Sequence, residues 1–79
     1  MSLDLQSPLQ GTVLIVDVEV GDQISEGQRV ALLESMKMEH EVLATSGGVI
    51  TKVCIEIGQM VAESEKLFYF DARETPLAN

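Results

Sequence analysis

The chain has 79 residues, of which 46% are hydrophobic, and 13 acidic against 5 basic side chains give it a formal net charge of −8. A chain of this length forms one domain with a small core, which leaves no room for a multi-part active site. The negative charge repels phosphate backbones and argues against nucleic acid as a partner. It either serves solubility or steers the domain toward basic docking surfaces on larger enzymes.

A single cysteine and a single histidine exclude an internal disulfide and leave no Cys/His cluster for a metal site. No apolar run reaches the roughly 18 residues of a membrane span, and the start lacks the features of a signal peptide. We therefore expect a soluble, intracellular protein with no membrane partner. Its expected compartment is the cytoplasm, or the mitochondrial matrix if the source is a eukaryote.

Two parts of the chain repeat one pattern. Residues 11–34 superpose on residues 48–71 without a gap, at a constant offset of 37 residues that places Gly21 on Gly58. Such self-similarity predicts two copies of one structural unit. We interpret residues 5–72 as the domain, with a leader or residues added for expression at 1–4 and a tail or linker at 73–79.

In chain order, the first predicted strand is Leu3–Ser7, which the offset makes the counterpart of His40–Ala44. The next strand of each half shows apolar and polar residues in alternation, the period of a strand with one buried face. Six apolar residues of these two runs are expected to face the core: Val16, Val18, Val20, Val53, Ile55 and Ile57. Each run ends at a glycine that allows a turn. The strands that follow are Arg29–Glu34 and Lys66–Asp71.

The central segment, residues 30–44, is ambiguous from propensity alone because it holds many helix formers and no Gly or Pro. The repeat favours strands, since Val30–Glu34 aligns with the aromatic-rich run Leu67–Asp71. We therefore expect antiparallel strands at 30–35 and 39–44, joined by a tight turn at Ser35–Met38. That turn lacks the Asn-Gly or Asp-Gly pair typical of two-residue hairpins.

The predicted fold is therefore all-β. Each half supplies four short strands, and two four-stranded antiparallel sheets pack face to face, or close into a flattened barrel, with quasi-two-fold symmetry. In this arrangement Lys37 lies on a hairpin turn at one end of the domain and the chain termini lie at the other. The turn residues around Lys37 are then expected to serve a function other than turning.

The segment Glu34–His40 reads Glu-Ser-Met-Lys-Met-Glu-His and resembles the biotin-attachment sequence of biotin carboxyl carrier domains, usually Glu-Ala-Met-Lys-Met. The similarity covers roughly residues 5–72 and includes three further segments: Ser7–Gly11, Val20–Asp22 and Gly48–Ile50. Two departures are Ser35, where alanine is usual, and Gln10, where proline is common. The resemblance implies a barrel-sandwich hybrid that displays Lys37 on an exposed hairpin.

The resemblance also implies a cofactor and partners. A biotin protein ligase would join biotin to the Nζ atom of Lys37 as an amide, with Met36 and Met38 as flanking recognition residues. The cofactor would then shuttle CO2 as carboxybiotin from a biotin carboxylase to a carboxyltransferase. The domain itself would be a non-catalytic carrier of a ligase-class complex, with no catalytic residues. Its short first half lacks room for a protruding thumb, which favours carriers of acyl-CoA, pyruvate or urea carboxylases.

Other interpretations stay open for the individual residues. Lys37 can be an ordinary solvated lysine, and Met36 and Met38 can be core fillers. Three carboxylates can be solvated edge charges or can contribute to partner recognition: Glu34, Glu39 and Glu41. Lys52 and Lys66 lie outside a Met-Lys-Met context and are expected to stay unmodified.

Two other functions compete with the carrier. One is a lipoyl domain of a 2-oxo acid dehydrogenase complex, whose lysine usually follows Asp, as in Glu-Thr-Asp-Lys-Ala, rather than Met. The other is an unmodified interaction module whose acidic sheet binds a partner. The first predicts a lipoyl group on Lys37, and the second predicts that Lys37 stays a free amine.

Overall fold

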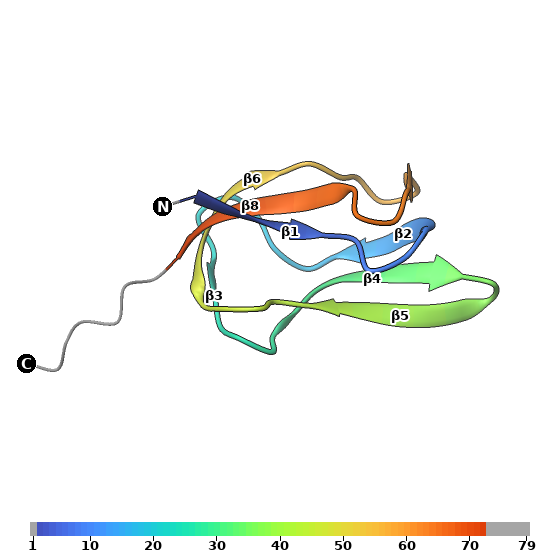
Figure 1. Ribbon diagram of the computed structural model, residues 1–79, viewed down its shortest axis with the longest axis horizontal. Coiled ribbons are helices and arrows are strands. Elements are labelled where there is room, and N and C mark those ends of the chain that lie inside the picture. The colour runs from blue at the N-terminus through green and yellow to red at the C-terminus, as the bar shows by residue number, and fades with distance from the viewer. Residues whose placement is uncertain (1, 73–79) are drawn as a thin grey trace, which may run out of the picture.

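The computed structural model describes residues 2–72, so the predicted tail at 73–79 lies outside the described residues. The described part forms eight strands (Figure 1): β1 Ser2–Gln6, β2 Gly11–Val16, β3 Gln23–Ile24, β4 Arg29–Ser35, β5 Met38–Leu43, β6 Gly48–Val53, β7 Met60–Val61 and β8 Lys66–Ala72. Within residues 2–72 the structure holds no helix that is long and apolar enough to cross a membrane.

The strands form two four-stranded antiparallel sheets that pack face to face. Their orders are β1-β8-β6-β3 and β5-β4-β2-β7. The offset of 37 residues carries β1 to β5, β2 to β6, β3 to β7 and β4 to β8, so each sheet is a copy of the other. This confirms the predicted all-β fold, with its two quasi-equivalent sheets, which corresponds to the barrel-sandwich hybrid that the resemblance implied.

The core lies between the two sheets and is built from both halves alike. Its largest fully buried side chains are Phe68, Phe70, Ile24, Leu33, Ile50, Leu67, Val13 and Val30. Leu33 of β4 aligns with Phe70 of β8 in the repeat, and both are buried. Burial of apolar surface at about 25 cal/mol per Å² is the main term that stabilises such a small sandwich.

For two of the six alternating apolar residues, the prediction that they face the core is wrong. Val20 and Ile57 are 63% and 69% exposed, whereas Val18 and Ile55 are buried. The reason is that β2 and β6 end at Val16 and Val53, before these residues. Alternation in the sequence therefore continues past the point where the strand stops.

Hydrogen bonds show where the chain goes after β2. The N–H of Asp17 donates to the carbonyl of Val30 in the same sheet, whereas the N–H of Gly21 donates to Ile50 in the other sheet. The segment between them crosses from one sheet to the other. It passes the core only at its middle, where Val18 lies, and reaches the surface at Val20. The second half repeats the crossing, because the N–H of Gly58 donates to the carbonyl of Val13.

The remaining boundaries differ from the prediction by a few residues. The hairpin strands predicted at 30–35 and 39–44 are confirmed as β4 and β5. β4 begins one residue earlier than predicted, and β5 both begins and ends one residue earlier. The first strand starts at Ser2, which pairs with Asp71. Residues 2–4, which were interpreted as a leader, therefore take part in the sheet.

Candidate functional site

Lys37 lies at the tip of the β4–β5 hairpin, which extends to one end of the domain, while β1 begins and β8 ends at the opposite end (Figure 1). The last pair of the ladder is Ser35 with Met38, so Met36 and Lys37 form a two-residue loop. The observed turn matches the predicted position. A two-residue loop between tightly paired strands holds its tip in a fixed direction, which a long loop would not.

The loop backbone is strained. Met36 and Lys37 have φ values of 54° and 67°, the left-handed region that a type I′ hairpin requires at both central residues. Asn and Gly adopt this region easily, whereas other residues with a Cβ atom pay about 1 kcal/mol or more each. Strain of this kind clusters at functional sites. The tip is therefore occupied by two residues that rarely adopt this backbone conformation.

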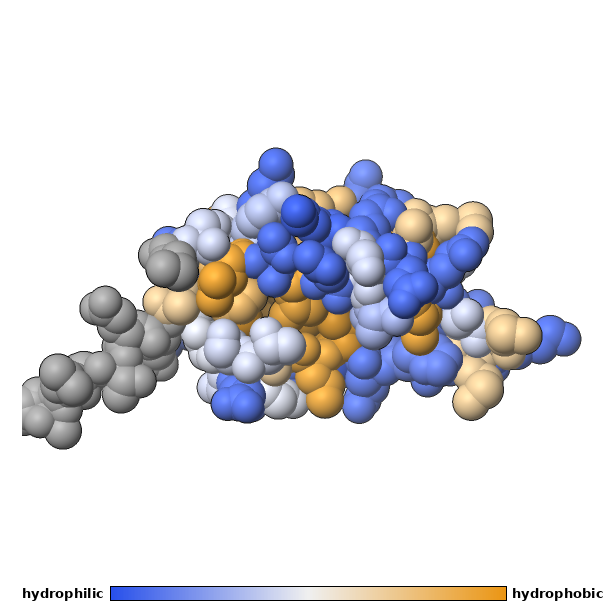
Figure 2. Space-filling model, in the orientation of Figure 1, coloured by the Kyte–Doolittle hydropathy of each residue, from blue (hydrophilic) through white to orange (hydrophobic). Residues whose placement is uncertain are grey.

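The tip side chains point into solvent. Met36 is 91% exposed and Met38 is 62% exposed, so the alternative that they fill the core is wrong. Lys37 between them is exposed as well. Figure 2 shows moderately hydrophobic residues beside hydrophilic ones at this end of the molecule. The arrangement presents a primary amine within an apolar collar.

Lys37 is also set apart by charge. Among residues 2–72, each other cationic side chain has a partner: Arg29 binds Asp17, Lys66 lies 3.8 Å from Asp4, and Lys52 lies 5.8 Å from the centre of the Tyr69 ring. Behind the tip, Glu34 and Glu39 are paired across the hairpin and both are exposed. The amine is thus a single positive charge in front of two carboxylates.

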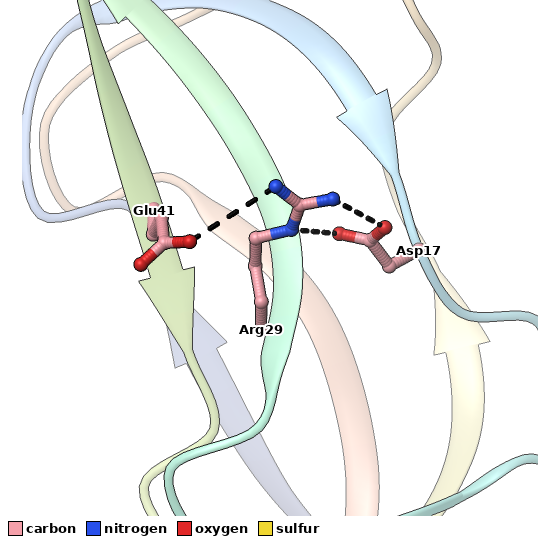
Figure 3. Close-up of polar contacts among 3 residues, drawn as sticks. All are labelled: Asp17, Arg29 and Glu41. Atoms are coloured by element: carbon pink, nitrogen blue, oxygen red, sulfur yellow. Dashed lines mark hydrogen bonds and ion pairs between the residues drawn. The ribbon is translucent and has the colours of Figure 1, made fainter.

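An ion-pair network braces the base of the hairpin (Figure 3). The Nε and Nη2 atoms of Arg29 donate to the two carboxylate oxygens of Asp17 at 2.9 and 3.1 Å, and Nη1 lies 4.0 Å from Glu41. The hydrogen bond and charge of Asp17 raise the pKa of Arg29 above its ordinary value. Glu41 is therefore part of this network, and the network ties β4 to β5 and to the end of β2.

The chemistry available at the tip is that of an accessible amine. Within residues 2–72 no three metal-ligating side chains come together. An exposed primary amine fits an amide bond with a carboxylic acid, which is how a prosthetic acid such as biotin would be held. The residues present therefore suit a group attached at Lys37 and fixed by a single covalent bond.

Comparison with known proteins identifies the family of the whole domain. The family described as "Biotin-requiring enzyme", the biotin/lipoyl attachment family, matches residues 1–70. The chain belongs to the biotin/lipoyl attachment family. The matched residues of this attachment domain include the β4–β5 hairpin with Lys37 at its tip.

Two curated relatives of the attachment domain have names that refer to biotin. It is 43% identical over 61 residues to the "Biotinylated protein TB7.3 homolog" of Mycobacterium leprae, covering 77% of this chain and 86% of that one. It is 40% identical over 63 residues to the "Biotin carboxyl carrier protein" of Streptococcus mutans, covering 80% of this chain and 48% of that one. The chain thus spans about half the length of the second relative.

Solved structures give the same fold. The domain superposes with a TM-score of 0.86 and 28% identity on a single-chain, multi-domain long-chain acyl-CoA carboxylase. The match covers 95% of this chain and 7% of that one. In that protein the attachment fold is a small part of a much larger chain.

One feature of the attachment domain was not found from the sequence. A shallow hollow adjoins the hairpin tip, and Met60 of β7 lines it together with Met36. Met60 is 68% exposed. The repeat could have revealed this residue, because it aligns Met60 with the polar residue Gln23. The fold accepts a polar side chain at this position, so the apolar side chain of Met60 suggests a role other than packing.

Proposed function

We propose that this chain is a biotin carboxyl carrier domain that holds biotin as an amide on Nζ of Lys37. The observation that carries the proposal is the exposed amine on a strained two-residue turn, between two exposed methionines, in a chain whose relatives include named biotin carriers. Lys37 is the attachment residue, and Met36 and Met38 flank it as recognition residues.

The scaffold's role is mechanical. Its paired β4–β5 hairpin presents Lys37 ahead of the domain, while the backbone ladder between β2 and β4 holds the hairpin in place and the Arg29–Asp17 ion pair adds a link at its base. Because the amine is tethered, the attached group stays at a high effective concentration near any enzyme that docks the domain. Biotin, when bound, supplies a ring nitrogen that can accept and release a carboxyl group.

Three enzyme partners follow from this role: a biotin protein ligase, a biotin carboxylase and a carboxyltransferase. The molecule that accepts the carboxyl group would bind to the carboxyltransferase, since the carrier's role is to deliver the attached biotin. Structural similarity to a long-chain acyl-CoA carboxylase and, at a TM-score of 0.83, to a urea carboxylase supports an acyl-CoA or urea carboxylase as the parent complex.

Intact mass tests the proposal. The purified chain is incubated with a biotin protein ligase, biotin and ATP, and peptide mapping locates any modification. We expect a gain of one biotin on Lys37 and none on Lys52 or Lys66. The Lys37→Arg variant should fold normally and gain nothing, because the change lies at an exposed turn.

A parallel reaction with a lipoate ligase separates the main rival. Lipoylation of Lys37 without biotinylation would overturn the proposal in favour of a lipoyl domain. No mass gain with either ligase would overturn it in favour of an unmodified interaction module.

A further inference from the structure

The outer face of one sheet carries a row of side chains at its lysine end. Thr12 of β2 pairs with Glu34 of β4 on one side and with Met60 of β7 on the other, while Glu34 pairs with Glu39 of β5. Next to this row lies the hollow beside the hairpin tip, lined by Gln10, Gly11, Thr12, Glu34, Ser35, Met36 and Met60. β7 thus brings an apolar side chain from a distant part of the sequence next to the lysine turn.

The repeat provides an internal comparison for Met60. At the other end of the domain the equivalent cross-strand pair is Gln23 with Val49. In that pair Gln23 takes the place of Met60 and Val49 takes the place of Thr12, and Met60 is 68% exposed. The fold therefore accepts glutamine in this strand position, and the exposure of the methionine at the lysine end is not required by packing.

An enzyme that acylates Lys37 must cover the tip. A typical protein–protein interface takes about 800 Å² and 20 or more residues from each partner, and even a transient one needs well over three. Met36, Lys37 and Met38 are too few, so the contact must continue onto the surface beside the hairpin. The hollow with Met60 provides apolar surface there, and methionine adapts its shape to different partners.

We propose that Met60, together with Met36, forms an apolar contact for the enzyme that acylates Lys37, while Glu34 and Glu39 face basic side chains of that enzyme. This inference rests on the proposed function and extends the recognition surface beyond the hairpin. Charge supports the second part, because the tip carries one cation ahead of a carboxylate pair and the chain has a net charge of −8.

Initial rates of biotinylation of the 79-residue chain test the contact. A purified biotin protein ligase is supplied with saturating biotin and ATP, and the domain concentration is varied. Met60→Gln should lower kcat/KM about fivefold or more, chiefly through KM, because it removes apolar contact area. Met60→Leu should stay within about twofold of the unchanged chain since it keeps that area.

Val20→Gln is the matched control, because Val20 is 63% exposed and lies in the crossing segment of the other half. Its kcat/KM should stay within about twofold of the unchanged chain. Equal thermal unfolding temperatures for the variants exclude a folding defect. Rates for the unchanged chain should also fall as salt rises, because charge pairs at the contact are screened.

Two outcomes overturn the inference alone. One is a Met60→Gln rate no lower than that of Val20→Gln, and the other is a loss that Met60→Leu fails to rescue. Both leave the proposed function intact, since Lys37 of the unchanged chain still gains biotin. Absence of labelling on the unchanged chain overturns the proposed function and this inference together.

Discussion

Ser64 occupies the position in the second half of the chain that Gly27 occupies in the first, and both hold a positive φ, 72° for Ser64 and 86° for Gly27. Each is the third residue of a matching turn. The N–H of Gln28 donates to the carbonyl of Ser25, and the N–H of Glu65 donates to the carbonyl of Ala62. Duplication has thus preserved a backbone shape that favours glycine while one copy carries serine.

This difference predicts that Ser64→Gly stabilises the domain by about 0.5–1 kcal/mol, because relief of left-handed strain outweighs the added freedom of the unfolded chain. Gly27→Ser should destabilise it by about 1 kcal/mol. Urea unfolding followed by circular dichroism measures both. A Ser64→Gly variant less stable than the unchanged chain would contradict the assignment of strain.

Strain at the lysine turn gives a second prediction. Met36→Asn places a residue suited to positive φ at the first loop position, so the free energy of unfolding should rise by about 0.5–1 kcal/mol. Biotinylation of the same variant should slow, because the apolar collar loses a member. Met38→Asn is the control: Met38 lies in β5 and is not among the positive-φ residues, so no gain is expected.

Opposite outcomes for neighbouring residues test the crossing segment. Ile55→Asp should unfold the domain, because a buried unpaired carboxylate costs several kcal/mol in a small core. Ile57→Asp, two residues later, should change stability by less than about 0.5 kcal/mol since Ile57 is exposed. Thermal unfolding of the two proteins distinguishes them. A folded Ile55→Asp domain would place that residue outside the core.

The close approach of the β6 backbone at Gly48 to β8 gives the fourth prediction. A Cβ atom added at Gly48 would overlap the carbonyl oxygen of Asp71 and lie 2.8 Å from Cδ2 of Phe70. Gly48→Ala should therefore destabilise the domain by about 1–3 kcal/mol through displacement of β8. Gly47→Ala is the matched control, where the nearest atom would be the Ile24 oxygen at 3.3 Å. Chemical denaturation of both variants measures the difference, and equal stabilities would contradict the close packing of β6 on β8.

The central hairpin shows how far local sequence signals extend. Propensity alone left residues 30–44 undecided between helix and strand, and the aligned second half indicated strands, which the structure confirms as β4 and β5. The repeat succeeded because two homologous segments must satisfy the same backbone pairing. It could not assign Val20 and Ile57, because alternation marks an amphipathic run but not the residue at which the chain leaves the sheet.

By itself the sequence determined the all-β class, the two-fold arrangement and the placement of Lys37 on a tight turn. These depend on periodicity, on the repeat and on a contiguous motif, all of which can be read from the order of residues along the chain. Only the tertiary structure decided that the crossing segments turn Val20 and Ile57 outward, and that Met60 lies beside the lysine hairpin. The first fact depends on where each crossing segment leaves its sheet, and the second depends on the pairing of β2 with β7 and with β4. Both are contacts between distant parts of the chain, which no local pattern specifies.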